Sequence, residues 1–294
     1  MLRSWLLAAR PATLWAGIAP VLVAGALAAR DEVFSWPHFT VILVAATAIQ
    51  VGVNFANDVA DAAKGADTAA RIGPARAVAS GLITSRQMWA GIGIAFAVAA
   101  AGGVYLISVA GPAIAVIGIA SIIAALGYTN GPSPYGYRGL GEAFVFVFFG
   151  LVATVGARYV FDRTAPIEAW LAGVVMGLLA TAILLANNVR DIETDAAAGK
   201  ETLVVKVGRP GGVAIYSAAL AGAYAVIVLA TLSGWLPLLA LFSLGTIPLA
   251  VPLVRTIRAE TAGPPLIGVL KGTARLQLLV ALSLSAAILV DYAL

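Results

Sequence analysis

The chain has 294 residues, of which 61% are hydrophobic and only 11% are charged, and it carries a formal net charge of +4. A soluble domain carries about 25% charged residues, so this composition excludes an ordinary soluble protein. The chain has no cysteine and a single histidine, His38, which excludes disulfides and Cys- or His-based metal clusters. Long charge-free windows recur, each near the roughly 20 residues that cross a bilayer as a helix. These features predict an all-α, polytopic membrane protein that lies in a lipid bilayer and has no nucleic-acid partner.

Charge-free windows and Pro/Gly breaks divide the chain into about nine expected spans within one membrane domain, residues 1–294. The expected spans are residues 11–29, 38–63, 88–109, 111–129, 140–161, 167–190, 212–233, 235–257 and 273–293. Ahead of the first span, an apolar patch from Trp5 to Ala9 lies between Arg3 and Arg10. This pattern predicts a short helix at the membrane interface.

Lysine and arginine are distributed unevenly between the two ends of these spans. All but three of the 18 basic residues fall on the side of the N-terminus; the exceptions are Arg30, Arg158 and Arg163. Basic residues are enriched in cytoplasmic loops. The distribution therefore predicts a multi-pass protein of the cell membrane with its N-terminus in the cytoplasm.

Two polar clusters interrupt the apolar sequence, in residues 54–67 and 187–200. Both contain the pattern Asn-x3-Asp, which Asn57 and Asp61 form in the first cluster and Asn187 and Asp191 form in the second. Residues four apart share one face of a helix. Ionised groups at membrane depth are costly and usually functional. Both clusters also fall on the expected cytoplasmic side, so they predict one shared site there.

The oxygen-rich side chains of these clusters suit a hard cation. Mg²⁺ typically takes one or two protein carboxylates and completes its shell with water and phosphate oxygens. Basic residues follow both clusters and could bind phosphate groups; they are Lys64, Arg71, Arg76, Arg190, Lys200 and Lys206. The pattern therefore predicts a site that holds Mg²⁺ against a diphosphate.

The motif Asn57-Asp58-x2-Asp61-x5-Asp67, taken together with Asp191-x3-Asp195, resembles the UbiA superfamily of intramembrane prenyltransferases. Three segments are similar to the branch of that family that prenylates 1,4-dihydroxy-2-naphthoate in menaquinone biosynthesis: residues 57–81, 135–142 and 187–200. The early segment Arg10-Pro11-x-Thr13 also fits. Many superfamily members have an aspartate where Gly65 stands, and quinone-branch members share the shift to Asp67.

The resemblance implies a UbiA-like helical bundle and a specific activity. A polyprenyl group would pass from an allylic polyprenyl diphosphate to the aromatic acid 1,4-dihydroxy-2-naphthoate, with loss of diphosphate and carbon dioxide, giving demethylmenaquinol. Mg²⁺ would be the cofactor. Its implied ligands are Asn57, Asp61, Asp191 and Asp195, with Asp67 assisting, and the resemblance implies that Asp61 and Asp191 are catalytic residues. Lys64, Arg71 and Lys200 would stabilise charge on the departing diphosphate.

The Gly/Pro-rich segment 128–138 is expected to cover the site. By the resemblance, Tyr128 would orient the diphosphate or the ring, Arg138 would receive the acceptor carboxylate, and Asn188 would hydrogen-bond a ring hydroxyl. Glu142 lies at the start of the fifth expected span, and we expect it to form an ion pair with Arg138.

Two alternatives stay open from the sequence. Another aromatic acceptor, such as 4-hydroxybenzoate or homogentisate, would use the same motifs. A secondary transporter would also combine repeats with polar residues in the membrane. The acidic residues, however, lie at one end of the spans, and the centres of the third, fourth, seventh and eighth spans carry no ionisable residue. The sequence predicts no particular oligomeric state.

Overall fold

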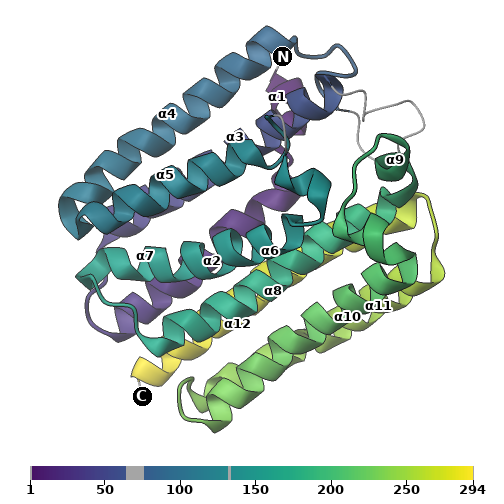
Figure 1. The fold of residues 1–294 in the computed structure, drawn as a ribbon. Helices are drawn as coiled ribbons and strands as arrows, with labels where there is room; N and C mark the ends of the chain where they lie inside the picture. The colour runs from purple at the N-terminus through teal and green to yellow at the C-terminus, as the bar shows by residue number, and fades with distance from the viewer. Residues whose placement is uncertain (1, 64–75, 132–133, 294) are drawn as a thin grey trace.

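The computed structural model describes residues 2–63, 76–131 and 134–293, and within these ranges every regular element is helical (Figure 1). The elements of the first half are α1 (Leu2–Ala9), α2 (Pro11–Arg30), α3 (Trp36–Ala63), α4 (Ser85–Ala110), α5 (Pro112–Gly127), the 3₁₀ turn η1 (Tyr135–Arg138), α6 (Gly141–Val145), the π-helical η2 (Phe146–Val152) and α7 (Ala153–Asp162). Those of the second half are α8 (Ile167–Arg190), α9 (Ile192–Ala197), α10 (Leu203–Leu232), the 3₁₀ segment η3 (Leu238–Thr246), α11 (Ile247–Ala259) and α12 (Pro264–Ala293).

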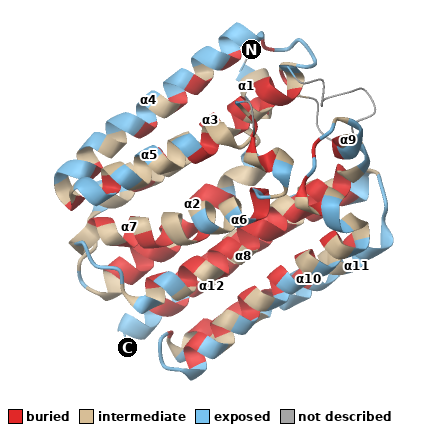
Figure 2. Cartoon of the chain, in the orientation of Figure 1, coloured by how far each residue is buried: buried red, intermediate tan, exposed pale blue. Residues whose placement is uncertain are grey.

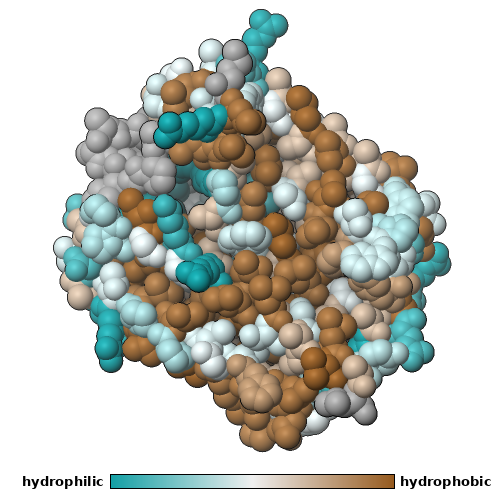
Figure 3. Space-filling view, turned by 180° about the vertical axis from the view of Figure 1, so that it is seen from behind, coloured by the Kyte–Doolittle hydropathy of each residue, from teal (hydrophilic) through white to brown (hydrophobic). Residues whose placement is uncertain are grey.

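The helices confirm a multi-pass integral membrane protein. Among the described residues, eight helical segments are long and apolar enough to cross a bilayer, and α5 is a shorter apolar helix beside them. This agrees with the expected number of about nine. In Figure 3 a broad hydrophobic surface runs between hydrophilic groups near its edges, as a lipid-facing surface should.

Two spans begin well before the residues that the sequence analysis predicted, whereas other helix starts differ by only a few residues. α10 starts at Leu203 instead of residue 212, because Thr202 caps its N-terminus by accepting from the Val205 N–H. The helix then kinks at Gly208, whose φ is 73°, and resumes at Pro210. α12 starts at Pro264 instead of residue 273. The predicted spans began only after the nearby basic residues, because the prediction used charge-free windows. The helices themselves include those basic residues and begin before them.

α8 forms the centre of the bundle. It packs against α2, α10 and α12 and is largely buried, whereas α4 is mostly exposed (Figure 2). Gly150 of η2 lies so close to α8 that a Cβ there would overlap the backbone of Gly177. Small residues allow such close helix approach in lipid. The π-helical turn therefore falls where the fifth span presses against the central helix.

The two ends of the bundle carry different polar groups. The N-terminus, α9 and the C-terminal end of α3 lie at one end, and the C-terminus lies at the other (Figure 1). At the end opposite the clusters, the buried guanidinium of Arg158 donates to Asp31 and to Asp162, each at 2.7 Å. This network ties α7 to the turn after α2. Both Asn/Asp clusters lie at the end of the N-terminus.

Candidate active site

A cavity of about 190 Å³ lies between the two clusters. Its polar wall includes Asn57, Asp61, Arg76, Asn187 and Lys200. Its apolar wall includes Ile49, Val53, Phe144, Phe148, Phe149, Ile183 and Leu184. Ile49 precedes Asp61 on α3 by about 18 Å at 1.5 Å per residue. The cavity therefore runs from the charged end of the bundle into its membrane-spanning part.

Asp61 lies in the last turn of α3 and is only 4% exposed. Its Oδ2 accepts from Arg76 at 3.3 Å, and its Oδ1 accepts from the Tyr137 hydroxyl at 3.0 Å. One turn earlier, Asn57 accepts through Oδ1 from Thr129 at 2.9 Å. The segment after α5 thus contacts both residues of the first Asn-x3-Asp pair.

Asp58 belongs to the same motif, but its carboxylate binds backbone N–H groups. It is 1% exposed, and its two oxygens accept from the backbone N–H groups of Ala77 and Val78 at 3.1 and 2.9 Å. These bonds hold the chain immediately after Arg76 against α3. Asp58 therefore helps to place the guanidinium that reaches Asp61.

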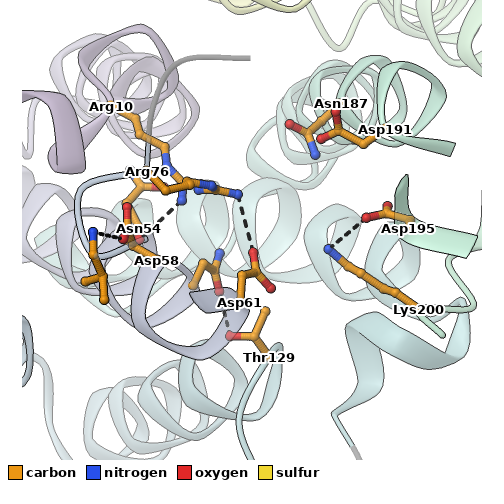
Figure 4. Close-up of polar contacts among 12 residues, drawn as sticks. Arg10, Asn54, Asp58, Asp61, Arg76, Thr129, Asn187, Asp191, Asp195 and Lys200 are labelled. Carbon is orange, nitrogen blue, oxygen red and sulfur yellow. Dashed lines mark hydrogen bonds and ion pairs between the residues drawn. The ribbon is translucent and has the colours of Figure 1, made fainter. Parts of the chain in front are cut away.

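The second cluster lies across the cavity at the end of α8 and in α9 (Figure 4). Arg190 donates to Asp191 at 2.7 Å and to the side-chain oxygen of Asn187 at 2.8 Å. Lys200 lies 3.6 Å from Oδ1 of Asp195 and 5.2 Å from the ring centre of Tyr137. The other oxygen of Asp195, Oδ2, is buried without a donor among the described residues.

The charges of the two clusters act on one another. Burial raises the pKa of Asp195 to about 6; Lys200 opposes this rise, and the negative charges of Asp191 and Asp61 add to it. A bound cation would relieve this repulsion and would find a free acceptor in Asp195 Oδ2. Within the described ranges, no three acidic or histidine side chains gather as a closed metal cage. The side-chain oxygens of the two clusters therefore suit a Mg²⁺ ion that completes its coordination shell with water and phosphate oxygens.

The structure places the predicted site residues in three groups. Asn57, Asp61, Tyr128 and Lys200 line the cavity, and Asp191 and Asp195 lie on its α8–α9 side. Lys64, Asp67 and Arg71 lie outside the described residues. Arg138 and Asn188 are not part of the cavity wall.

The environments of these last two residues differ from the sequence-based interpretation. Arg138 is exposed, and its backbone carbonyl accepts from Lys206 at 2.7 Å. Asn188 is 2% exposed and donates to Oε1 of Glu142 at 2.9 Å. The expected ion pair between Glu142 and Arg138 is therefore wrong, because Glu142 turns into the interior and pairs with α8.

Several cavity residues were not assigned a role from the sequence: Arg10, Gln50, Asn54 and Asn187. Asn54 donates to the carbonyl of Ala9 at 2.9 Å and so joins α3 to the turn between α1 and α2. Arg10 and Asn187 belong to motifs that the sequence analysis names, and the sequence carries a spacing signal for the other two. Gln50, Asn54, Asn57 and Asp61 are spaced by four, three and four residues, which makes one polar stripe on α3.

A second cavity, of about 360 Å³, adjoins the first, and five residues line both: Arg10, Thr13, Arg76, Asn187 and Leu270. Four basic residues line it: Arg10, Arg76, Arg190 and Lys271. Apolar side chains of Leu7, Pro11, Ala12, Ile267 and Leu270 lie in the same wall, together with the polar Thr13 and Asn187 and one acid, Asp58. Arg10 has a φ of 50°, a conformation that is costly for a residue with a side chain. Cationic and apolar walls together suit an aromatic anion.

The fold and the paired clusters define an intramembrane prenyltransferase, and comparison with known proteins shows the family. The model of the UbiA prenyltransferase family matches residues 18–289. This chain belongs to the UbiA prenyltransferase family, as the sequence motifs predicted.

Two relatives within the family carry the same name. The chain is 36% identical over 270 residues to the 1,4-dihydroxy-2-naphthoate octaprenyltransferase of Mycobacterium leprae, which covers 92% of this chain and 90% of the relative. It is 38% identical to the protein of that name from Escherichia coli, with 81% of each chain covered.

Solved structures share the fold. The apo structure of a UbiA homolog from Aeropyrum pernix K1 has a TM-score of 0.70 at 19% identity, and covers 95% of this chain and 97% of that one. The structure of a UbiA homolog from Archaeoglobus fulgidus bound to GPP and Mg²⁺ has a TM-score of 0.68 at 15% identity, with 98% and 99% covered.

Proposed function

We propose that this protein transfers a polyprenyl group from a polyprenyl diphosphate to 1,4-dihydroxy-2-naphthoate, with loss of diphosphate and carbon dioxide. One observation carries the proposal: two Asn/Asp clusters face each other across a cavity whose wall changes from charged to apolar. Such a cavity suits a ligand with a diphosphate head and a long apolar tail. The acceptor is supported by the shared name of the relatives at 36–39% identity.

The charged end would bind the diphosphate. Asn57, Asp61, Asp191 and Asp195 would hold Mg²⁺, with Asp67 as a further ligand. When bound, Mg²⁺ would neutralise charge on the departing diphosphate oxygens. Arg76 and Lys200 line the same end and would contact the diphosphate directly, and Lys64 and Arg71 would add to this positive charge. The Archaeoglobus homolog binds GPP together with Mg²⁺, which supports this arrangement.

The apolar end would receive the prenyl tail. Phe144 stacks on Tyr135 with ring centres 3.9 Å apart and lies 6.0 Å from Phe148 in a parallel arrangement. All three line the cavity. The π faces of these rings would stabilise an allylic cation and exclude water from it.

The second cavity would receive the aromatic acid. Its four basic residues suit the carboxylate, and its apolar wall suits the rings. Arg10 lines both cavities, so an acid bound there would lie next to the diphosphate site. Arg10 and Lys271 are therefore better placed for the carboxylate than the exposed Arg138. The electron-rich ring would attack the allylic carbon through its carboxyl-bearing carbon, and carbon dioxide would then leave.

The site would open on the cytoplasmic side of the cell membrane. Both clusters lie at the end of the bundle that carries the N-terminus. The sequence analysis assigns all but three of the basic residues to the same end, and basic residues are enriched on the cytoplasmic side. Protease or thiol-labelling access to a cysteine introduced at Glu201, an exposed position near the second cluster, would test the orientation.

A product assay tests the proposed function. Purified protein in detergent would receive Mg²⁺, a polyprenyl diphosphate and either 1,4-dihydroxy-2-naphthoate, 4-hydroxybenzoate or homogentisate. We expect a decarboxylated prenyl naphthoquinol from the first acceptor only. A product from another acceptor would keep the prenyltransferase and change its substrate.

A further inference from the structure

Gln50 lies on α3, and only one end of its side-chain amide is hydrogen-bonded. The residue is 6% exposed and lines the first cavity. Its Nε2 donates to the backbone carbonyl of Thr13 on α2 at 3.3 Å. Because that partner can only accept, it fixes which end of the amide carries the NH₂ group. The other end, Oε1, is buried and receives no hydrogen bond from the described residues.

The position of this oxygen points to a ligand. Other buried side-chain oxygens of the described residues also lack a partner, but that of Gln50 alone belongs to a residue in the wall of either cavity. A buried acceptor without a donor is costly. A ligand that brings a hydrogen-bond donor into the cavity would remove this cost.

Hydrogen bonds connect Gln50 to the wall that the two cavities share. Its partner Thr13 lines both cavities, as does Arg10. The Thr13 hydroxyl donates to the Arg10 carbonyl at 3.0 Å and accepts from Asn54, one turn after Gln50, at 3.4 Å. The Arg10 guanidinium in turn donates to the Asn54 carbonyl at 3.5 Å. Gln50 therefore lies on the first-cavity side of the border between the two proposed substrate sites.

The proposed acceptor has to cross this border. Its carboxylate would bind among the basic residues of the second cavity, whereas the allylic carbon that its ring attacks would lie in the first. The ring must therefore reach past Arg10 and Thr13 into the first cavity. Its hydroxyl groups would then enter the part of the wall that contains Gln50.

Only the acceptor brings the donor that Oε1 lacks. The prenyl tail is apolar, and an ionised diphosphate offers acceptor oxygens alone. The hydroxyl groups of a dihydroxynaphthoate can each donate one hydrogen bond. The hydroxyls also make the ring electron-rich, so a residue that selects a hydroxylated ring selects a ring that can react.

We infer that Gln50 determines acceptor specificity by accepting a hydrogen bond, through Oε1, from a ring hydroxyl of the bound naphthoate. This inference rests on the proposed function. The bond from Nε2 to Thr13 holds the amide so that its oxygen is available to the ligand. Gln50 is thus a specificity residue, and it takes no proton from the substrate.

The test measures the Kd of four acids by anaerobic calorimetric titration of the purified full-length protein. The acids are 1,4-dihydroxy-2-naphthoate, 1-hydroxy-2-naphthoate, 4-hydroxy-2-naphthoate and 2-naphthoate. Gln50→Met keeps the length of the side chain and removes the acceptor oxygen. Gln277→Met is the matched control, because Gln277 is also buried, donates to the carbonyl of Met176 at 3.2 Å and has an unpaired Oε1, but lies outside both cavity walls.

In Gln50→Met the Kd of the dihydroxy acid should rise roughly 5- to 50-fold, because its hydroxyl loses the acceptor. The Kd of 2-naphthoate should stay within about twofold of the wild type. The rise should appear with only one of the two monohydroxy acids, which identifies the hydroxyl that Gln50 binds. Gln277→Met should leave all four Kd values near those of the wild type.

Two results of the titrations would overturn the inference. An equal rise for all four acids would assign Gln50 a structural role, and unchanged Kd values in Gln50→Met would exclude the contact. The proposed function is judged separately, by the product assay on the wild-type protein. No product from the dihydroxynaphthoate would overturn that function, whereas normal product with either of these titration results would overturn only the role of Gln50.

Discussion

The guanidinium of Arg76 donates to Oδ2 of Asp61 across 15 residues of sequence, at 3.3 Å. The same guanidinium lines both cavities. Arg76 therefore holds the proposed catalytic carboxylate in one orientation and offers positive charge to the diphosphate. Arg86, which is exposed and lies outside both cavity walls, gives a matched comparison.

Arg76→Ala should reduce kcat by 10²–10³-fold, because such losses are common when one preorganised charge donor is removed. The KM for the prenyl diphosphate should rise as well. Steady-state kinetics with the diphosphate varied would measure both effects, and Arg86→Ala should remain near the wild type. Equal activity in the two variants would contradict a role in diphosphate binding.

Asp61→Asn and Asp191→Asn should each remove most metal-dependent activity. Each change keeps the side-chain size and removes one negative charge from the proposed Mg²⁺ site, where the cation would hold the diphosphate. Activity measured against Mg²⁺ concentration should show a loss of about 10²-fold or more. Chelation of the wild-type protein should have the same effect. Asp291→Asn, an exposed change at the opposite end of the bundle, should leave the Mg²⁺ dependence unaltered.

Arg10→Ala should weaken acceptor binding more than Arg138→Ala does. Arg10 lines the basic second cavity, whereas Arg138 is exposed and outside both cavity walls. A hydrogen bond to a charged group contributes about 1.5–3 kcal/mol, so the acceptor KM should rise roughly 10- to 100-fold. Acceptor titrations at saturating prenyl diphosphate would test this. A larger effect of Arg138→Ala would restore the role that the sequence suggested for it.

Asp58→Ala should lower stability as well as activity. The change removes the acceptor for two backbone N–H groups at a buried position. Leaving buried donors unpaired costs about 1–3 kcal/mol each, and the released segment carries Arg76. The thermal unfolding midpoint in detergent should fall by several degrees. Asp61→Asn should move that midpoint less, so the two neighbouring aspartates should separate into structural and catalytic roles.

Arg158→Met should destabilise the opposite end of the bundle. Arg158 is 2% exposed and donates to two carboxylates, which the change would leave without their shared cation. Breaking a fully buried pair costs about 3–5 kcal/mol, and the cost here should be smaller because both carboxylates keep contact with solvent. The unfolding midpoint should fall, and the KM for Mg²⁺ and for both substrates should not change. The double variant with Asp162→Asn should recover part of the loss.

The sequence by itself determined the membrane class, the approximate spans, the two Asn/Asp clusters and the family. These features rest on local signals: apolar windows show the spans, and a four-residue spacing places Asn57 beside Asp61 on one helix face. The same helical spacing also predicts the polar stripe from Gln50 to Asp61 on one face of α3.

Tertiary structure alone decided which of those residues act together. Asp58 and Asp61 are three residues apart. Asp58 accepts from two backbone N–H groups, whereas Asp61 lines the first cavity. Arg138 resembled a substrate ligand and is exposed, and Glu142 turned to Asn188 instead. These outcomes depend on contacts between segments far apart in the chain, which a helical period does not encode. Long-range packing of α3, α6 and α8 therefore decides where each charge of the motifs finally lies.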